Sequence, residues 1–369
     1  MIAEQYNVAE RANTKVARAE TISQPPDQTW AVLGGLRFVL ASIVFWTHFG
    51  GYVRLPAPLS HIADAGAFAA VLGFFVVSGY SIAASLQRSP HHFYDRRLSR
   101  IYPVYFACMV LACVPFLLYG PLISAAGGVE APKSVWPVIA NFFFLGGIAT
   151  PVMPTNPVVW SLAIEVVYYL FAPWLARLRS GWLLMVIALS VAAYWGHDWF
   201  GVVTFNILLF GSYGTLALAW AWLSGFLLRR HPGQTPLVAG VLFTGVLLLG
   251  RFDQYIGHFS HAVFVGSVLV VASARQFSVP RVVVKALDWL GDLSYPLYLC
   301  HVPLLLLLYG GGRDWAWPVG VGAVAAGSVL LLHGVDLPYR AYARRRSNRH
   351  DTLMSVKSIC APVPTSLQE

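Results

Sequence analysis

Long apolar stretches recur along most of the chain, and short polar or basic segments separate them. Eleven such stretches lie at residues 30–50, 66–86, 101–120, 135–149, 158–177, 182–196, 204–228, 236–250, 261–275, 289–309 and 316–336. Most approach the roughly 17–25 residues that a transmembrane helix needs. The pattern therefore predicts an all-α fold, a polytopic bundle of membrane helices.

Basic residues indicate which stretches cross the membrane. They follow the second, fifth, seventh, ninth and last stretches, and cytoplasmic ends of membrane helices are enriched in such residues. If all eleven stretches crossed, those after the fifth and later odd-numbered ones would lie on the wrong side. Stretch 135–149 is short and is interrupted by Pro137 and by Gly146 and Gly147, so we predict that it is re-entrant from the outside. About ten helices then cross, with both termini cytoplasmic.

These assignments divide the chain into three parts. We predict a cytoplasmic polar N-terminal tail at 1–29, a transmembrane domain at 30–340 and a cytoplasmic basic tail, expected to be disordered, at 341–369. The first 28 residues contain no apolar core followed by a small-residue cleavage site, so they do not have the pattern of a signal peptide.

Composition narrows the class of protein. With 57% hydrophobic and 11% charged residues, the chain does not have the composition of a soluble domain. The net charge of +9 comes from residues at helix ends, which predicts contact with membrane lipids and no nucleic-acid partner. The four cysteines form no CxxC pair, so neither a disulfide framework nor a metal site is expected.

Two ionisable residues, Arg37 and His48, lie within the first apolar stretch. Their separation of eleven residues corresponds to about three helical turns plus about 20°, and to a rise of about 16 Å, so they share a face at different depths. Ionisable groups at membrane depth usually face a partner or a wet cavity. We favour a shared polar channel. The alternative is that Arg37 extends to the inner interface and His48 lies at the outer one.

Five segments in order resemble the acyltransferase-3 family of integral-membrane O-acyltransferases. Arg37 and His48 match its first-helix pattern of a basic residue, ten others and a histidine. The other four segments are FFVVSGY at 74–80, RRLSRIYPVY at 96–105, WSLAIEVVYYLFAP at 160–173 and LGDLSYPLYLCHVP at 290–303. One departure is Leu72, where many members carry an acidic residue.

The resemblance implies an activity and a location. It implies transfer of an acyl group, by default acetyl, from cytoplasmic acyl-CoA to a hydroxyl of a sugar in an exported or cell-surface glycan. Acyl-CoA is then a co-substrate, with no permanently bound cofactor and no metal. The resemblance also implies a multi-pass protein of the bacterial inner membrane, and a separate periplasmic or glycan-export protein is a candidate partner.

Three residues are candidates for the chemistry. His48 is the expected general base, because an imidazole titrates near neutral pH, although attack by the imidazole itself to form an acyl-histidine is an open alternative. Arg37 is expected to stabilise negative charge in the channel. Glu165, on the same side of the membrane as His48, is expected to orient His48 or to bind the acceptor, or only to pair with Arg37 so that the bundle folds.

Other residues are candidates for binding. Arg97 and Arg100 lie three residues apart on a cytoplasmic helix end, where guanidinium groups suit the phosphates of CoA, although ordinary positive-inside anchoring is the alternative. Ser78 and Tyr102 belong to the matching segments and join this group. Residues of the later segments are expected to line the acyl channel: Trp160, Ser161, Tyr295, Tyr298 and His301. For His301 alone, a hydrogen-bonded core histidine is the alternative.

Two other classes of protein compete with an enzyme. A transporter of a sugar or anionic solute would use Arg37, His48 and Glu165 as a polar channel, and a structural membrane subunit would use them only as paired charges. Neither class accounts for the five ordered segments. The chain lacks the HxxxxD, GxSxG, GxxxxGK[ST] and HExxH motifs, which excludes the commonest soluble chemistries.

Overall fold

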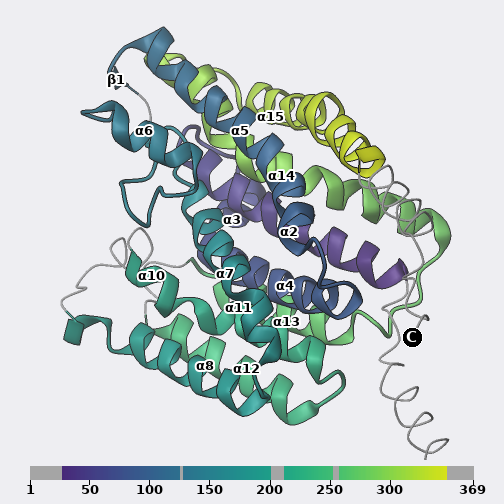
Figure 1. The fold of residues 1–369 in the computed structure, drawn as a ribbon. Helices are drawn as coiled ribbons and strands as arrows, with labels where there is room; N and C mark the ends of the chain where they lie inside the picture. The colour runs from purple at the N-terminus through teal and green to yellow at the C-terminus, as the bar shows by residue number, and fades with distance from the viewer. Residues whose placement is uncertain (1–26, 125–127, 201–211, 252–256, 347–369) are drawn as a thin grey trace, which may run out of the picture.

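The computed structural model describes residues 27–124, 128–200, 212–251 and 257–346, and these ranges are mostly helical (Figure 1). Helix α2 (Asp27–Gly50) lies at the centre of the bundle. It packs along α14 (Arg281–Tyr309) and against α4 (Ala67–Arg88), and α4 in turn packs against α11 (Ala219–Arg230) and α13 (Ser260–Ser273).

Glycines allow the central helices to approach closely. A Cβ atom on Gly291 of α14 would lie 2.6 Å from the Cα of Gly34 on α2, and one on Gly79 of α4 would lie 1.8 Å from the carbonyl oxygen of Trp222 on α11. Helix packing between membrane segments depends on such small residues. Gly79 of the FFVVSGY segment is therefore explained by contact between α4 and α11.

Further helices surround this centre. In Figure 1, α5 and α15 lie beside α14 at the top, and α8 and α12 form the bottom layer. The bounds of these outer elements are α5 (Phe93–Tyr119), α7 (Val159–Arg177), α8 (Ser180–Trp195), α10 (Ser212–Ala217), α12 (Thr235–Gly250) and α15 (Trp317–Leu331). Shorter elements complete the fold: α3 (Ala57–Ala63), α6 (Val135–Phe142), the 3-10 turns η1 (His197–Phe200) and η3 (Gly310–Gly312), the π-helical segment η4 (Leu332–Asp336), and the antiparallel pair β1 (Leu122–Ile123) and β2 (Val129–Glu130).

The described helices are of membrane-spanning character. Six of them within the described ranges are long and apolar enough to cross a bilayer, and α8, α12 and α13 are shorter apolar helices. Part of the predicted stretch 204–228 lies outside the described residues, and the rest forms α10 and α11. The predicted helical membrane bundle is thus confirmed, while the number of crossings and the side of each terminus remain predictions.

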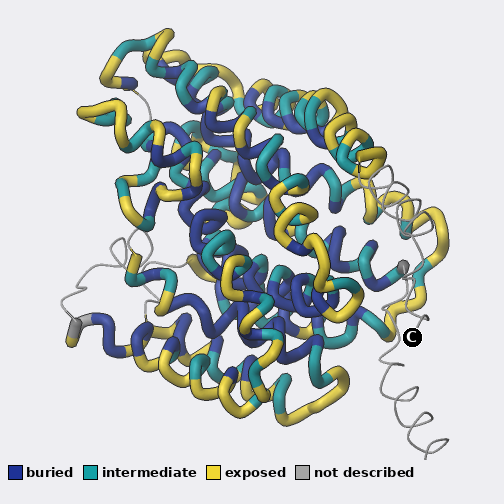
Figure 2. Tube along the Cα trace, in the orientation of Figure 1, coloured by how far each residue is buried: buried dark blue, intermediate teal, exposed yellow. Residues whose placement is uncertain are grey.

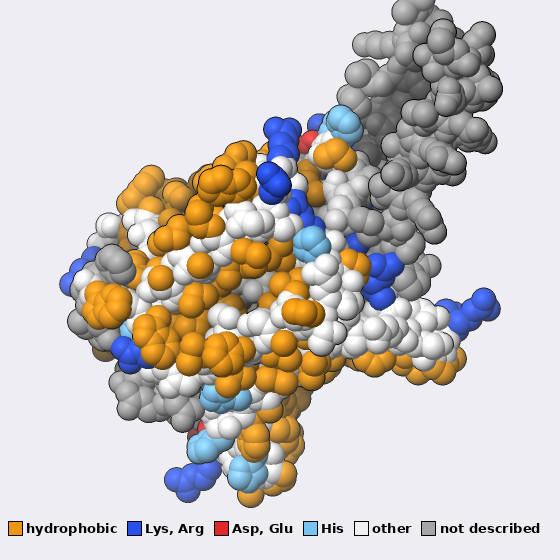
Figure 3. All heavy atoms as spheres, turned by 90° about the horizontal axis from the view of Figure 1, so that it is seen from below, with side chains coloured by type: hydrophobic (Ala, Val, Ile, Leu, Met, Phe, Trp, Pro, Cys, Tyr) orange, Lys and Arg blue, Asp and Glu red, His pale blue; other side chains and the backbone are white. Residues whose placement is uncertain are grey.

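Burial follows the expected pattern for a bundle in lipid. The central helices α4 and α14 are mostly buried, whereas the outer faces are exposed and apolar, with Leu117 81% exposed and Phe243 and Leu330 each 71% exposed (Figure 2). Figure 3 shows one face dominated by hydrophobic side chains, with lysines and arginines in separate groups near its margins. Apolar surface this extensive is what lipid contact requires.

The stretch 135–149 folds as a short helix followed by a compact loop. Helix α6 has eight residues, about 12 Å, which is too short to span a bilayer. The buried side chain of Asn141 holds the loop, since its Nδ2 donates to the carbonyl oxygens of Pro137 and Pro151 and its Oδ1 accepts from the Met153 amide, at 2.8, 2.9 and 2.9 Å. This geometry suits a segment that does not cross, and the re-entrant course of the stretch stays a prediction.

The last described helix extends past the predicted domain boundary. After η4 the chain remains helical to Arg346, so that Trp317–Arg346 forms one continuous apolar-to-basic helix. Residues 341–346, predicted to belong to a disordered tail, are therefore helical. The rest of that tail and residues 1–26 lie outside the described residues.

Candidate functional site

A polar cavity of about 130 Å³ lies inside the bundle. It is walled by α2, α4, α5, α7 and α14, which brings together side chains from all five matching segments. Its polar lining includes Arg37, Ser78, Arg97, Ser161, Glu165 and Tyr298. We call it the inner cavity.

A larger cavity of about 840 Å³ lies next to it and is strongly basic. We call it the basic cavity. It is formed by residues of α2, the end of α4, the start of α5 and the end of the last helix. Its arginines are Arg37, Arg88, Arg96, Arg97, Arg100, Arg340 and Arg344, and none of the described residues that line it is acidic. Arg37, Ser81, Arg97 and Arg100 line both cavities, so the two adjoin.

Arg37 lies where the cavities adjoin, half-buried, with its Nε atom lacking a hydrogen-bond partner among the described residues. A buried guanidinium with an unused donor is poised to bind an anion. His48, about 16 Å further along α2, lines neither cavity. The shared channel therefore stays a prediction, with Arg37 inside the cavities and His48 beyond them.

His48 instead forms a pair with His301 of α14. The Nε2 atom of His301 lies 3.2 Å from Nδ1 of His48, and the ring centroids are 5.2 Å apart. Each Nδ1 also lies near a backbone carbonyl oxygen, that of Val44 for His48 (3.0 Å) and that of Leu297 for His301 (3.1 Å). His301 is fully buried.

These contacts are satisfied by one arrangement of protons on the pair. A carbonyl oxygen only accepts, so each Nδ1 must donate, and His301 Nε2 is then an acceptor facing the His48 Nδ1–H. We assign both rings to this neutral tautomer. The Nε2 atom of His48 consequently keeps its lone pair, which is the form that a general base or a nucleophile requires.

Glu165 has partners other than those predicted. Its Oε1 accepts a hydrogen bond from the Tyr169 hydroxyl at 2.6 Å, and Ser78 is a second hydrogen-bonding neighbour. The contacts of the described residues do not join it to His48 or to Arg37, although Arg97 and Arg37 both attract its charge. Glu165 therefore belongs to the inner cavity, in the part of the polar interior that contains the arginines.

The remaining channel candidates and Tyr102, a candidate for binding CoA, divide into two groups. Tyr298 and Ser161 line the inner cavity and are hydrogen-bonded to each other at 2.7 Å, and Tyr295, also in the lining, donates to the carbonyl oxygen of Ile101 at 2.7 Å. Trp160 and Tyr102 line neither cavity. Trp160 is 7% exposed, and Tyr102 lies edge-on to Phe144 with ring centroids 6.0 Å apart.

The comparison with known families agrees with the resemblance in the sequence. The model of the acyltransferase-3 family, described as an acyltransferase domain, matches residues 30–333. The chain belongs to the acyltransferase-3 family. Membership covers every helix that lines the inner cavity, and the match ends before Arg340 and Arg344 of the basic cavity.

The curated proteins to which this acyltransferase-3 chain is similar are bacterial. The peptidoglycan O-acetyltransferase OatA of Listeria monocytogenes is 25% identical over 66% of this chain and 45% of its own length. Nodulation protein 10 of Rhizobium leguminosarum bv. viciae is 25% identical over 85% of this chain and 95% of its own, and O-acetyltransferase OatA of Staphylococcus aureus is 25% identical over 66% and 47%. The chain thus spans about half the length of the OatA proteins. No solved structure matches.

Several residues of this acyltransferase-3 site were not found from the sequence. The contact of His301 with His48 joins residues 253 positions apart, and no local pattern indicates it. Arg340 and Arg344 were assigned only to the basic end of the last helix. Their spacing of four residues is the one available signal, because it places both on the same helix face.

Proposed function

We propose that this membrane protein transfers an acyl group, by default acetyl, from acyl-CoA to a hydroxyl of a sugar in an exported or cell-surface glycan. The observation that carries the proposal is the basic cavity adjoining a polar inner cavity, within an acyltransferase-3 chain. The names of the relatives from Listeria and Staphylococcus support O-acetyl transfer. We place the protein in the bacterial inner membrane with about ten crossings and both termini cytoplasmic.

The basic cavity suits the nucleotide end of the donor. Acyl-CoA carries a diphosphate and a 3′-phosphate, and planar guanidinium groups bind phosphate oxygens in pairs. The helix ends that form this cavity are those that the positive-inside rule places in the cytoplasm. Arg97 and Arg100, at the junction of the cavities, would hold the diphosphate, and the pantetheine arm would extend past Arg37 into the inner cavity.

His48 is the proposed base. Tyr298, which lines the inner cavity, has its ring centroid 6.3 Å from that of His301, which in turn contacts His48. These two residues form a layer between the inner cavity and His48, and the thioester reaches His48 when this layer moves. His48 Nε2 accepts the proton of the acceptor hydroxyl, the oxygen attacks the thioester carbonyl carbon, the C–S bond breaks, and the CoA thiolate leaves with the proton from the imidazolium.

Replacing His48 with alanine tests the proposal. We expect acyl transfer to fall by roughly 10²–10⁴-fold, because a positioned base contributes a factor of that size, while binding of acetyl-CoA is retained. The measurements are binding of acetyl-CoA to the purified protein, and NMR of O-acetyl groups on the host's surface and exported glycans in wild type, deletion and His48→Ala strains. A transporter would instead move solute without consuming acetyl-CoA.

The outcomes separate the parts of the proposal. If the deletion and His48→Ala strains lose the same O-acetyl signal, that signal identifies the acceptor. If only the deletion strain loses it, His48 is not the base. A trapped acyl-histidine after rapid quenching would replace direct transfer with a two-step reaction through His48.

A further inference from the structure

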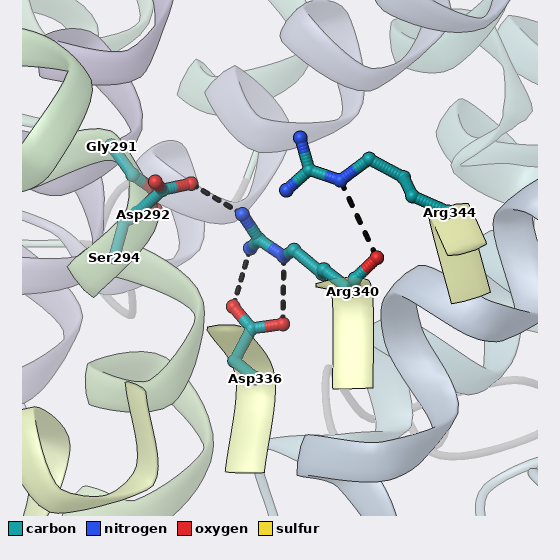
Figure 4. Close-up of polar contacts among 6 residues, drawn as sticks. All are labelled: Gly291, Asp292, Ser294, Asp336, Arg340 and Arg344. Carbon is teal, nitrogen blue, oxygen red and sulfur yellow. Dashed lines mark hydrogen bonds and ion pairs between the residues drawn. The ribbon is translucent and has the colours of Figure 1, made fainter. Parts of the chain in front are cut away.

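The end of the last helix adds two arginines to the basic cavity, beyond the region that the family match covers. Arg340 and Arg344 lie one helical turn apart after the π-helical segment η4, and both line the cavity. Figure 4 shows their side chains extending from the last helix on the same side, towards α14. The two arginines differ in what they contact.

Arg340 is held by two carboxylates. Its Nε donates to Asp336 Oδ1 at 2.8 Å, its Nη2 donates to the other oxygen of Asp336, and its Nη1 donates to Asp292 Oδ1 of α14 at 2.6 Å (Figure 4). A bidentate pair plus a third bond fixes the guanidinium in one orientation. Arg340 therefore joins the last helix to α14 and has its charge balanced by protein groups.

Of these two arginines, Arg344 is the one whose charge is more available to bind an anion. Its Nε lies 3.4 Å from the backbone oxygen of Arg340, a weak contact, and it forms no ion pair with a carboxylate among the described residues. In Figure 4 no dashed line joins its guanidinium to either aspartate. It is exposed, and its charge adds to a cavity that already contains many arginines.

The order of groups along the donor indicates which phosphate Arg344 meets. In acyl-CoA the thioester is followed by pantetheine, then the diphosphate, then the ribose 3′-phosphate. Arg97 and Arg100 line both cavities and so lie nearest the pantetheine, at the diphosphate. Arg344 lines only the basic cavity and is absent from the lining of the inner cavity. Among the described residues, three other arginines are confined to this cavity. Arg340 is paired with carboxylates, Arg96 donates to the backbone oxygens of His91 and Ser89, and Arg88 at the end of α4 also has a partner within the protein.

We propose that Arg344 binds the 3′-phosphate of the CoA moiety, and that the pairing of Arg340 with Asp292 and Asp336 positions the helix end that carries it. This proposal rests on the proposed donor. Arg344 would thereby let the protein distinguish CoA thioesters from acyl donors that lack a 3′-phosphate. An anionic lipid headgroup offers similar phosphate chemistry and is the competing source.

The test compares acetyl-CoA with acetyl-3′-dephospho-CoA in binding to the purified protein in nanodiscs of neutral lipid. For Arg344→Gln we expect affinity for acetyl-CoA to fall on the order of tenfold, the effect of losing a charge-assisted hydrogen bond, and affinity for the dephospho compound to stay unchanged. Arg344→Lys should keep part of the preference. Arg345→Gln is the matched control, because Arg345 is exposed but lines neither cavity.

Each result decides between stated alternatives. Equal losses for both ligands in Arg344→Gln, or an intact preference for the 3′-phosphate, would overturn the proposal. A site for a lipid headgroup would show as loss of co-purifying anionic lipid in Arg344→Gln with the ligand preference unchanged, which also overturns it. If the wild-type protein binds neither CoA compound, the proposed donor itself is wrong, and this outcome is distinct from failure at Arg344.

Discussion

The lone pair on Nε2 of His48 depends on two neighbours of Nδ1. His301 Nε2 accepts from the His48 Nδ1–H, and this contact together with the carbonyl oxygen of Val44 keeps the proton on Nδ1. A residue that holds a catalytic imidazole in one tautomer acts through it, as the aspartate of a serine protease does. His301 is thus a positioning residue, and its full burial agrees equally with a role in the core.

Two substitutions at His301 separate these roles. His301→Gln retains a side-chain acceptor, whereas His301→Phe fills the space without one. We expect His301→Phe to lower kcat on the order of tenfold more than His301→Gln, the effect of one lost hydrogen bond, with KM for acetyl-CoA unchanged. Steady-state kinetics with a thiol reagent for released CoA would measure this. Equal kcat values for the two variants, with matching losses in Tm, would leave His301 only a core residue.

At the residue scale, the sequence predicted positions along one helix better than contacts between two helices. The spacing of Arg37 and His48 predicts one continuous helix with both residues on it, and α2 is that helix. Hydrogen-bond partners on different helices are set by how the helices pack, so the link of His48 to His301 could not be predicted from the sequence. The Glu165 to Tyr169 link spans one helical turn, but the prediction looked for a cation.

The end of the last helix is an element whose position depends on Arg340. The side chain of Asp336 is 2% exposed, so removal of Arg340 leaves a buried carboxylate without its cation. For Arg340→Met we expect a loss of about 3 kcal/mol in the free energy of unfolding, the usual result of breaking a buried ion pair. Thermal unfolding in detergent, followed by tryptophan fluorescence, measures the lowered Tm.

Two further variants serve as controls for the loss of stability in Arg340→Met. Arg340→Met combined with Asp336→Leu removes both charges and should recover much of the lost stability, because apolar replacements of buried pairs are often neutral. Arg344→Gln should leave Tm unchanged, since Arg344 has no described ion pair. A stable Arg340→Met single variant would show that Arg340 does not anchor the helix end.

Element boundaries were predicted well where hydropathy changes sharply and less well where it does not. Helix α7 begins and ends within a residue of the predicted stretch 158–177. In contrast, α14 begins at Arg281 and α5 at Phe93, about eight residues before their apolar cores, because the helix continues through polar and basic turns before the apolar core begins. The helical residues 341–346 have the same cause.

For the whole molecule, the orientation of every functional group depends on whether residues 135–149 cross the membrane. With α6 re-entrant, the loop before it is outside and the turn between α7 and α8 is inside. If the stretch crossed, that turn and Arg179 would be outside. The end of the last helix would then be outside as well, although it lines the basic cavity together with the start of α5. The short α6 and the loop held by Asn141 favour the first arrangement.

Single cysteines at exposed positions distinguish the two arrangements. Lys133 lies before α6 and Arg179 lies between α7 and α8, and both are exposed. In a variant with Cys113 and Cys360 replaced by serine, we expect a membrane-impermeant maleimide to label Lys133→Cys in cells with an intact inner membrane, and to label Arg179→Cys only after that membrane is permeabilised. Cys108 and Cys300 are buried and should stay unlabelled in both conditions. Labelling of Arg179→Cys in intact cells would place a crossing at 135–149 and would overturn the predicted re-entrant segment.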